Sequence, residues 1–337
     1  MKARHAQIAG IGSALPERLV HNAELEDLVD TTDQWIYSRT GIRARRFAGE
    51  GETAASLAAD AASRALEAAG RDPGSVDLTV IATVSGDQPL PSTASFVQDR
   101  LGIGGAAFDL QAACAGFIYA AEVAAAQIAT GGAETALVVG TEVLSRFVNF
   151  ADRTTCVLFG DGAGAAVLVP GEEPGIMGSV LENDGRHAHL LEIPAGGSAR
   201  PATPETAGSG AHKIVMSDGR EVFKRAVVGM AGAAARLLEK AGMTPEEVTL
   251  LVPHQANARI IRAVAERMSF PMDRVFVDLE EVGNTSAASV PIALDHAWRR
   301  GLLAPGDVVL TVAFGAGLAW GANLLRWTAP SYDGSPS

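Results

Sequence analysis

Ala61–Val80 reads AASRALEAAGRDPGSVDLTV, and Ala233–Val252 reads AAARLLEKAGMTPEEVTLLV. The two stretches align without a gap at a constant offset of 172 residues. Each pattern predicts an amphipathic helix, a glycine stop, a proline-containing turn and then an apolar strand. Chance similarity between two alanine-rich helices is the alternative explanation. We favour an internal repeat of one helix–turn–strand unit.

Two more pairs of segments follow in the same order along the chain. Phe96–Ile103 (FVQDRLGI) corresponds to Ala263–Phe270 (AVAERMSF), and Glu134–Gly140 (ETALVVG) corresponds to Asp307–Phe314 (DVVLTVAF). The offset drifts by a few residues, as changes in loop length require. The chain therefore contains two α/β halves of similar topology.

The halves are predicted to span about residues 1–170 and 171–330, joined by the Gly/Pro/Glu-rich segment Pro170–Gly175. Their strands, such as LTVIATV and VVLTVAF, are apolar on both faces. This is typical of sheets that are covered by helices on both sides. Pro194–His212 is rich in small and polar residues without a period, and it is predicted to be a long surface loop.

The composition excludes several classes of protein. The 337 residues are 47% hydrophobic and 20% charged, which is a globular balance, and the net charge is −12. This acidity argues against nucleic acid as the main partner, because such binding neutralises phosphates with Lys and Arg. No stretch reaches the roughly 18 uncharged apolar residues of a membrane span. We expect a cytoplasmic protein with no membrane partner, in which Cys114 and Cys156 are reduced.

Cys114 lies in FDLQAACAGFI (residues 108–118), where an apolar strand leads into a helix of small residues, Ala115–Thr130. Free N–H groups and the helix dipole at such a start stabilise a thiolate, so we expect the pKa of this cysteine to be lowered. The alternative is a small buried cysteine that packs against the helix.

His254 and Asn284 are the other candidates for chemistry. His254 follows an apolar strand in LVPHQAN, at the strand end where open α/β sheets bind ligands, although it could be a buried core histidine. Asn284, in VGNTSAASVP, opens a helix and could be a simple N-cap. Cys114 and Asn284 are 170 residues apart, close to the repeat offset, so they occupy roughly equivalent helix starts. This placement predicts one shared site.

Other polar and glycine-rich segments carry weaker signals. FGDGAGA (residues 159–165) and AFGAGLAW (residues 313–320) allow close backbone approach, but neither has a phosphate-loop pattern. His187 and His189 could share one face of an extended chain, yet no further His or Cys flanks them. We predict no metal site.

The combination of QAACAGF, VPHQAN, GNTSAASVP and GDGAGAAVL, with TTDQWIYSRTGIRARR near the N-terminus, resembles the type III β-ketoacyl-[acyl-carrier-protein] synthases of the thiolase superfamily. The resemblance covers about residues 1–328. It implies a duplicated, five-layered αβαβα fold and a homodimer. It also implies an acyltransferase that condenses an acyl-CoA starter with malonyl-[acyl-carrier-protein] to begin fatty-acid synthesis, without a cofactor.

The resemblance also implies roles for individual residues. Cys114 would accept the acyl group, and His254 and Asn284 would stabilise the enolate formed when malonyl thioester loses carbon dioxide. The backbone N–H groups of Cys114 and Gly317 would form the oxyanion hole. The chain departs from the commonest pattern at Ala316, where the family usually has glycine.

Substrate-binding residues are implied in the same way. The positions matching the family's coenzyme A contacts are Trp35, Arg39 and Arg153. Leu90 matches the position where a loop of the partner subunit closes the acyl pocket, and Phe is frequent there. The carrier protein is acidic, so docking needs a basic patch, for which the candidates are Lys224, Arg259 and Arg262.

Two further interpretations stay open from the sequence. The chain could be a starter-unit synthase or acyl transferase of a specialised, polyketide-type pathway, or a non-catalytic acyl-binding partner subunit. The thiolase branch, with its second catalytic cysteine, does not fit, because Cys156 lies in the strand-like segment TTCVLFG. The elongating branch, with two histidines, does not fit because Asn284 stands where the second histidine would be.

Overall fold

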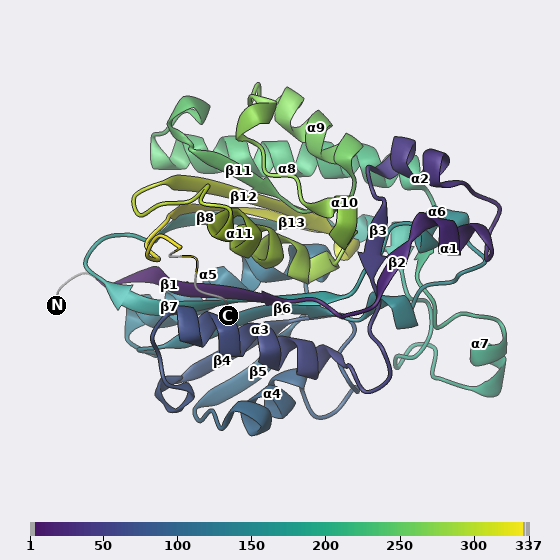
Figure 1. The fold of residues 1–337 in the computed structure, drawn as a ribbon, viewed down its shortest axis with the longest axis horizontal. Helices are drawn as coiled ribbons and strands as arrows, with labels where there is room; N and C mark the ends of the chain where they lie inside the picture. Colours follow the sequence, from purple (N-terminus) through teal and green to yellow (C-terminus); the bar gives the residue numbers. More distant parts are fainter. Residues whose placement is uncertain (1–3, 333, 335–337) are drawn as a thin grey trace.

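The computed structural model describes residues 4–332 and 334. Figure 1 shows two β-sheets stacked one above the other, with helices between them and a further helical layer on each outer face. This is the five-layered αβαβα arrangement, and it confirms the predicted α/β fold class. The order of layers places the carboxyl ends of strands from both sheets around one central region.

The first sheet has the strand order β1-β7-β6-β4-β5. Its parallel part is β6-β4-β5, with Val80 opposite Val138 in the register, while β7 runs antiparallel to both β6 and β1. The strands are β1 (His5–Ala14), β4 (Leu78–Ala82), β5 (Ala106–Leu110), β6 (Ala136–Glu142) and β7 (Gly162–Gly171).

The second sheet has the order β11-β12-β13-β8 and repeats the first. β11 runs parallel to β12, and a parallel bridge from Leu251 to Val275 occupies the place that β5 has in the first sheet. Reading β8-β13-β12-β11-Val275 therefore reproduces β1-β7-β6-β4-β5. The strands are β8 (Ile176–Asn183), β11 (Leu250–Pro253), β12 (Val308–Gly315) and β13 (Ala319–Arg326).

Helices cover every face of the two sheets. α3 (Ala54–Ala68) and α4 (Thr93–Leu101) pack on the outer face of the first sheet, and α8 (Gly219–Ala241), with α9 (Ala258–Arg267) against it, covers the outer face of the second. α5 (Gly116–Thr130) and α11 (Ser289–Arg299) lie between the sheets. Buried alanines dominate α3 and α5, and such small side chains let helix and sheet backbones approach closely.

The repeated unit has the predicted elements in both copies. α3 is followed by Gly70 at φ 58°, a 3-10 turn at Pro73–Ser75 and then β4. α8 is followed by Gly242 at φ 66°, a 3-10 turn at Pro245–Glu247 and then β11. In each copy proline begins the turn, where its fixed φ and missing N–H cost nothing.

Helix α5 is apolar for a reason internal to the fold. The window Ala113–Thr130 is long and apolar enough to cross a membrane by length and composition alone. It contacts strands of both sheets, and residues such as Ala120, Ala124 and Ile128 are fully buried. The composition of this helix is accounted for by its position as the central core element.

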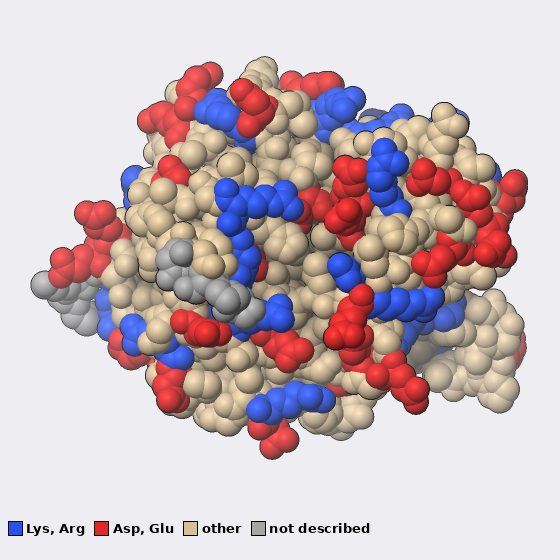
Figure 2. Space-filling model, in the orientation of Figure 1, with Lys and Arg blue, Asp and Glu red and all other residues tan. Residues whose placement is uncertain are grey.

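Shorter helices and strands lie around the ends of the sheet strands. These are β2 (Leu19–His21), α1 (Asn22–Glu26), α2 (Asp33–Thr40), β3 (Ala44–Arg46), α6 (Arg153–Cys156), β9 (Leu191–Glu192), α7 (Pro204–Gly208), β10 (Val215–Met216) and α10 (Leu279–Val282). Figure 2 shows acidic side chains gathered over the α1–α2 region, while the rest of that face mixes both signs.

One local expectation is wrong, and the predicted surface loop at residues 194–212 is incomplete. Cys156 ends the helix α6 rather than lying in a strand, because the side chain of Asp152 caps this turn by accepting from Thr154 N and Thr155 Oγ1. The segment 194–212 is not structureless, because Thr203 and Thr206 form a capping box at the start of α7. Figure 1 shows α7 projecting from the body of the molecule.

Candidate active site

Cys114 lies in the 3-10 turn Ala113–Ala115 that connects β5 to α5. The turn is unusual because Ala113 adopts a φ of 45°, a left-handed conformation that residues with a Cβ rarely take. The end of β12 passes so close that a Cβ on Gly315 would collide with the backbone nitrogen of Cys114. Glycine at 315 therefore lets the second sheet support the turn that holds the thiol.

The environment of the Cys114 thiol is apolar rather than cationic. The residue is 9% exposed, and burial raises the pKa of its thiol to about 12. A hydrogen bond with Ser286 acts in the opposite direction, and the negative charge of Glu142 adds to the rise in pKa. The expected lowering of this pKa at the helix start is therefore wrong, because lost hydration of the thiolate outweighs the local dipole.

Asn284 enters the same region from the second half of the chain. Its backbone is fixed by two hydrogen bonds, from Asn284 N to Leu158 O at 2.9 Å and from Gly160 N to Asn284 O at 3.0 Å. The side-chain oxygen accepts from Ser286 N at 2.9 Å. This contact fixes the amide so that its NH₂ group is left to donate toward a ligand.

His254 follows β11 and is buried, with its backbone N–H donating to Val312 O at 2.7 Å. Burial lowers the pKa of its imidazole to about 3, so the ring is neutral at physiological pH. Nδ1 lies 2.6 Å from Ser289 Oγ, and Gln255 N–H points to that same oxygen at 3.5 Å. In the tautomer in which the Ser289 hydroxyl donates to Nδ1, the neutral ring carries its proton on Nε2.

Cys114, His254 and Asn284 line one cavity of about 150 Å³. Most of its other walls are apolar and come from α8, the start of α9 and the end of β12, including Phe223, Ile260 and Phe314. The structure therefore brings Cys114 together with two residues that lie 140 and 170 positions further along the chain.

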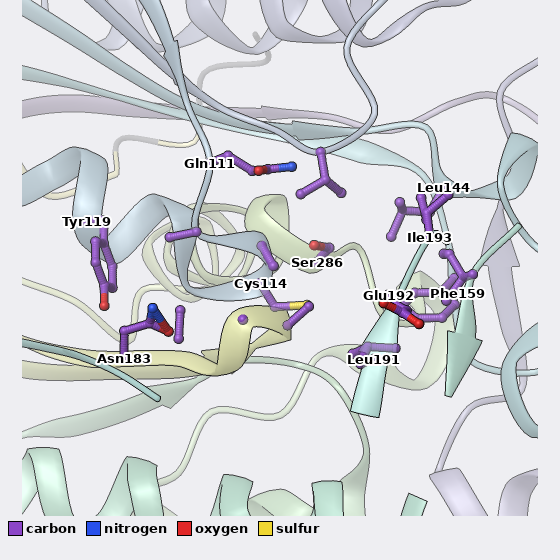
Figure 3. Close-up of a pocket in the computed structure, with 17 residues that line it drawn as sticks. Gln111, Cys114, Tyr119, Leu144, Phe159, Asn183, Leu191, Glu192, Ile193 and Ser286 are labelled. Carbon is purple, nitrogen blue, oxygen red and sulfur yellow. The ribbon is translucent and has the colours of Figure 1, made fainter. Parts of the chain in front are cut away.

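A second cavity of about 410 Å³ meets the first at Cys114. Figure 3 shows that Cys114 and Ser286 lie near its middle. One end is mostly apolar and the other is polar. The mostly apolar end contains Leu144, Phe159, Leu191 and Ile193, with the carboxylate of Glu192 beside them, and the polar end contains Gln111, Tyr119 and Asn183.

Gly317 and Ala316 both line this larger cavity beside Cys114. Gly317 has a φ of 130°, which a residue with a side chain would adopt only with strain. With alanine at position 316, the loop still places Gly317 at the cavity wall. The oxyanion role of Gly317 stays a prediction.

The implied coenzyme A contacts cluster on the surface formed by α2 and α6. The guanidinium carbon of Arg153 lies 4.6 Å from the centre of the Trp35 ring, and that of Arg39 lies 5.9 Å from it. Asn257, which lines the smaller cavity, donates from Nδ2 to Arg39 O at 3.1 Å. A cationic and aromatic surface thus adjoins the wall of the cavity that contains His254.

Lys224, Arg259 and Arg262 are exposed on α8 and α9, which pack against each other. Phe223 and Ile260, the sequence neighbours of Lys224 and Arg259, line the smaller cavity. Lys224 also lies 4.0 Å from Glu221, an exposed pair that contributes little energy.

Leu90 is 83% exposed and lines neither cavity of its own chain. Its predicted contact with an acyl group is not made within one chain. The two histidines at 187 and 189 have ring centres 6.5 Å apart, and His187 contacts Asp184. Within residues 4–332 and 334, no group of three or more His, Cys, Asp or Glu could hold a metal ion.

Three residues at the site escaped the sequence analysis: Glu142, Ser286 and Ser289. Both serines lie in the segment GNTSAASVP, where a small polar residue is easily taken for a helix cap. Glu142 ends the otherwise apolar strand ALVVGTE, and an acid at a buried strand end is the signal that could have revealed it.

Two family models match the two segments of the chain that contribute residues to the site. The model for 3-oxoacyl-[acyl-carrier-protein] synthase III matches residues 108–185, which include Cys114, and the model for its C-terminal part matches residues 238–327, which include His254 and Asn284. A β-ketoacyl-[acyl-carrier-protein] synthase III of Symbiobacterium thermophilum is 51% identical over 330 residues, covering 97% of this chain and 99% of that protein. The chain belongs to the β-ketoacyl-[acyl-carrier-protein] synthase III family.

Further relatives are similar in sequence or in structure. A relative from Caldanaerobacter subterraneus is 49% identical over 96% of this chain and 98% of its own length. The crystal structure of 3-oxoacyl-[acyl-carrier-protein] synthase III from Aquifex aeolicus has a TM-score of 0.88 at 45% identity, covering 96% of this chain and all of that chain. A priming β-ketosynthase of a polyketide pathway has a TM-score of 0.90 at 39% identity, over 98% of both chains.

Proposed function

We propose that this chain condenses an acyl-CoA starter with malonyl-[acyl-carrier-protein] to give 3-oxoacyl-[acyl-carrier-protein], the initiating step of fatty-acid synthesis. The single observation that carries the proposal is the cavity lined by Cys114, His254 and Asn284 together. A thiol, a neutral imidazole and a primary amide are the groups needed for acyl transfer followed by stabilisation of an enolate.

Loading is the first step. The Cys114 sulfur attacks the thioester carbonyl of acyl-CoA, and coenzyme A leaves as its thiol. The acyl chain extends into the apolar end of the larger cavity, between Leu144, Phe159 and Ile193. Backbone N–H groups of Cys114 and Gly317 stabilise the tetrahedral oxyanion. The 410 Å³ cavity is large enough for a short or branched chain.

Condensation is the second step. The malonyl thioester enters the smaller cavity, and its carbonyl oxygen receives hydrogen bonds from His254 Nε2–H and Asn284 Nδ2. Loss of carbon dioxide gives an enolate, whose carbon attacks the acyl carbon on Cys114. The bond from that carbon to the Cys114 sulfur then breaks, which frees the cysteine for the next turnover. Because burial keeps the His254 ring neutral, it donates a hydrogen bond without a prior protonation step.

Substrate delivery uses the surface around the smaller cavity. The Trp35 ring, with Arg39 and Arg153 beside it, provides a stacking face and guanidinium groups for the adenine and phosphates of coenzyme A. Lys224, Arg259 and Arg262 provide positive charge for an acidic carrier protein. Neither step as written needs a cofactor.

We also propose that the functional unit is a homodimer. β5 lies at the edge of the first sheet, and its Phe108 is 38% exposed. Leu90, on the loop between β4 and α4, is also exposed. Pairing of two β5 edges would cover these apolar side chains and bring Leu90 to the acyl cavity of the partner subunit.

The experiment is a reconstituted assay with purified protein, a panel of acyl-CoA substrates and malonyl-[acyl-carrier-protein]. We expect formation of 3-oxoacyl-[acyl-carrier-protein], detected by mass spectrometry of the carrier protein, with an acyl adduct on Cys114 when the malonyl substrate is left out. Acyl transfer without carbon–carbon bond formation would contradict the proposal. The polyketide-type alternative is not favoured, because the relatives at 49–51% identity carry the synthase III name.

A further inference from the structure

A buried carboxylate lies behind the candidate nucleophile. Glu142, at the carboxyl end of β6, has no exposed surface. Its Oε2 accepts from Ser85 Oγ at 2.5 Å, Val84 N at 3.2 Å and Thr83 Oγ1 at 3.3 Å. Within residues 4–332 and 334, no Lys, Arg or His forms an ion pair with it. A carboxylate buried without a cation is costly and needs an explanation beyond packing.

The hydroxyl of Ser286 separates the remaining oxygen of Glu142 from the cavity. Oε1 accepts from Ser286 Oγ at 3.0 Å, and Ser286 lines the same cavity as Cys114. Ser286 and Cys114 lie together in Figure 3. Ser286 has a φ of 51°, and Asn284 Oδ1 accepts from its N–H, so its backbone is fixed in a conformation that serine rarely adopts.

We infer that Ser286 and Glu142 form a relay that accepts the proton of the Cys114 thiol during loading. This inference rests on the proposed function, in which Cys114 accepts the acyl group. Ser286 lies beside Cys114 in the same cavity and takes the proton directly. Glu142 acts through Ser286 and sets the direction of its hydroxyl.

The relay balances in protons and bonds. The thiol proton passes to Ser286 Oγ while the Ser286 hydroxyl proton passes to Glu142 Oε1, which gives a thiolate and a neutral carboxylic acid. The thiolate forms a bond with the acyl carbon, and the bond from that carbon to the coenzyme A sulfur breaks. The proton then returns through Ser286 to the departing sulfur, so coenzyme A leaves as a thiol and Glu142 is again a carboxylate.

The charges around Glu142 suit this role. Burial raises the pKa of Glu142 to about 7, which matches a proton acceptor working near neutral pH. The titratable group facing it across Ser286 is Cys114, beyond which lies the neutral His254. Asp161, next to its strand partner Gly162, is turned instead toward Ser145 and Ala48.

The relay and a purely electrostatic role predict opposite signs. The Glu142 charge by itself raises the pKa of the Cys114 thiol, so its removal would favour the thiolate and speed loading. Removal of a proton acceptor would slow loading instead. Glu142→Gln keeps the shape and removes both the charge and the acceptor, so the sign of its effect decides between the two.

The experiment measures single-turnover acylation of Cys114 by acetyl-CoA, with rapid quenching and intact-mass detection, from pH 5.5 to 9. We expect the loading rate of the unmodified protein to rise near pH 7. Glu142→Gln should lose that rise and load about 100-fold more slowly at pH 7.5. Glu142→Asp should recover part of the rate. A Glu142→Gln protein that loads as fast as the unmodified protein, or faster, would overturn the relay.

Ser286→Gly tests the middle of the relay without adding backbone strain, because glycine adopts a positive φ freely. We expect loading to fall at least tenfold. The matched control is Ser13→Ala, which removes a serine hydroxyl that donates at 2.5 Å to another buried carboxylate, Asp295, outside both cavities. Its loading rate should match that of the unmodified protein. Equal slowing in the control would overturn the assignment.

A second measurement separates the relay from the proposed function. Alkylation of Cys114 by iodoacetamide, followed by peptide mass mapping, needs no acyl-CoA. The relay predicts slower alkylation in Glu142→Gln at pH 7.5, with loss of the inflection near pH 7. If the unmodified protein shows that inflection but accepts no acyl group, the relay stands and the proposed function fails. If alkylation speeds up in Glu142→Gln, the relay fails whatever the substrate.

Discussion

The two helix starts at the centre of the molecule have the same backbone and different side chains. In the first half, Ala113 has a φ of 45°, begins a 3-10 turn and leads into α5. In the second half, Ser286 has a φ of 51°, begins a 3-10 turn at Ser286–Ala288 and leads into α11. These two left-handed residues are 173 positions apart, close to the offset of the repeat.

The side chains at equivalent positions divide the chemistry. At that offset Cys114 corresponds to Ala287, and Asn284 corresponds to Gln111. The first start presents a nucleophilic sulfur, while the second presents an amide and a hydroxyl to the same cavities. Duplication thus supplies two equivalent scaffolds that face each other. Substitution of a few residues places the nucleophile on the first, and the enolate-stabilising amide with the Ser286 hydroxyl on the second.

The most severe test of this division removes the sulfur. Cys114→Ala should abolish the acyl adduct, a loss of at least about 1,000-fold, because the second start offers no nucleophile of comparable strength. Cys156→Ala is the matched control and should keep the adduct, since Cys156 is buried in α6 and lines neither cavity. Intact-mass spectrometry reads both. An adduct that survives Cys114→Ala would remove the first helix start from the mechanism.

The histidine beside the second helix start gives the next largest effect. His254→Ala should reduce product formation by about 100- to 1,000-fold while still allowing acylation of Cys114, because one donor to the enolate is lost. Ser289→Ala should have a smaller effect in the same step, since it frees Nδ1 and lets the ring change tautomer. Condensation at the normal rate in His254→Ala would show that the second half does not stabilise the enolate.

The free energy of unfolding should depend on pH because of the buried carboxyl group of Glu142. Because burial raises the pKa of Glu142 from 4.5 to about 7, the unfolded chain loses this proton first, and the free energy of unfolding falls as pH rises between those values. Glu142→Gln removes this penalty. Relative to the unmodified protein, the variant should gain about 3 kcal/mol between pH 4.5 and 7. Urea unfolding at several pH values measures it, and a pH-independent difference would contradict the raised pKa.

The smallest effect concerns a loop that differs between the halves. In the first half, residues 83–92 connect β4 to α4 and carry Leu90, whereas only residues 254–257 connect β11 to α9. Leu90→Phe should slow loading of isobutyryl- and octanoyl-CoA about tenfold by overpacking the partner's pocket, and change acetyl loading little. Equal slowing with all three substrates would mean that Leu90 supports the loop without lining the acyl pocket.

The two similar halves and their helix starts could be predicted from the sequence because they depend on local patterns. The glycine and proline after each helix fix the turns after α3 and α8, and the repeat they mark predicts two similar sheets. The sequence predicts that Cys114 and Asn284 occupy equivalent helix starts because their separation of 170 residues is close to the repeat offset. The two residues are not strictly equivalent. The left-handed residues Ala113 and Ser286 are 173 positions apart, whereas Cys114 and Asn284 are 170 positions apart, a difference of three positions.

The properties that the sequence did not reveal depend on contacts between distant segments. A helix start is visible locally and suggested a reactive thiolate, but the burial that raises the pKa of Cys114 comes from packing between both halves. Glu142 and Ser286 are 144 residues apart, and only the folded chain shows that they share a hydrogen bond. The Cys156 helix was missed because Thr154 and Thr155 favour strands, and the Asp152 cap overrides them.

The measurement that tests the division most directly follows a single turnover of Asn284→Ala. The protein is mixed with acetyl-CoA and then malonyl-[acyl-carrier-protein], quenched at intervals and weighed intact. We predict that acetyl-Cys114 still forms, at a rate reduced by the lost contact between Asn284 and Ser286 N, and then persists, because the sulfur lies on the first helix start and the enolate-stabilising amide on the second. An adduct that forms and decays as in the unmodified protein, or that never forms, would contradict the account.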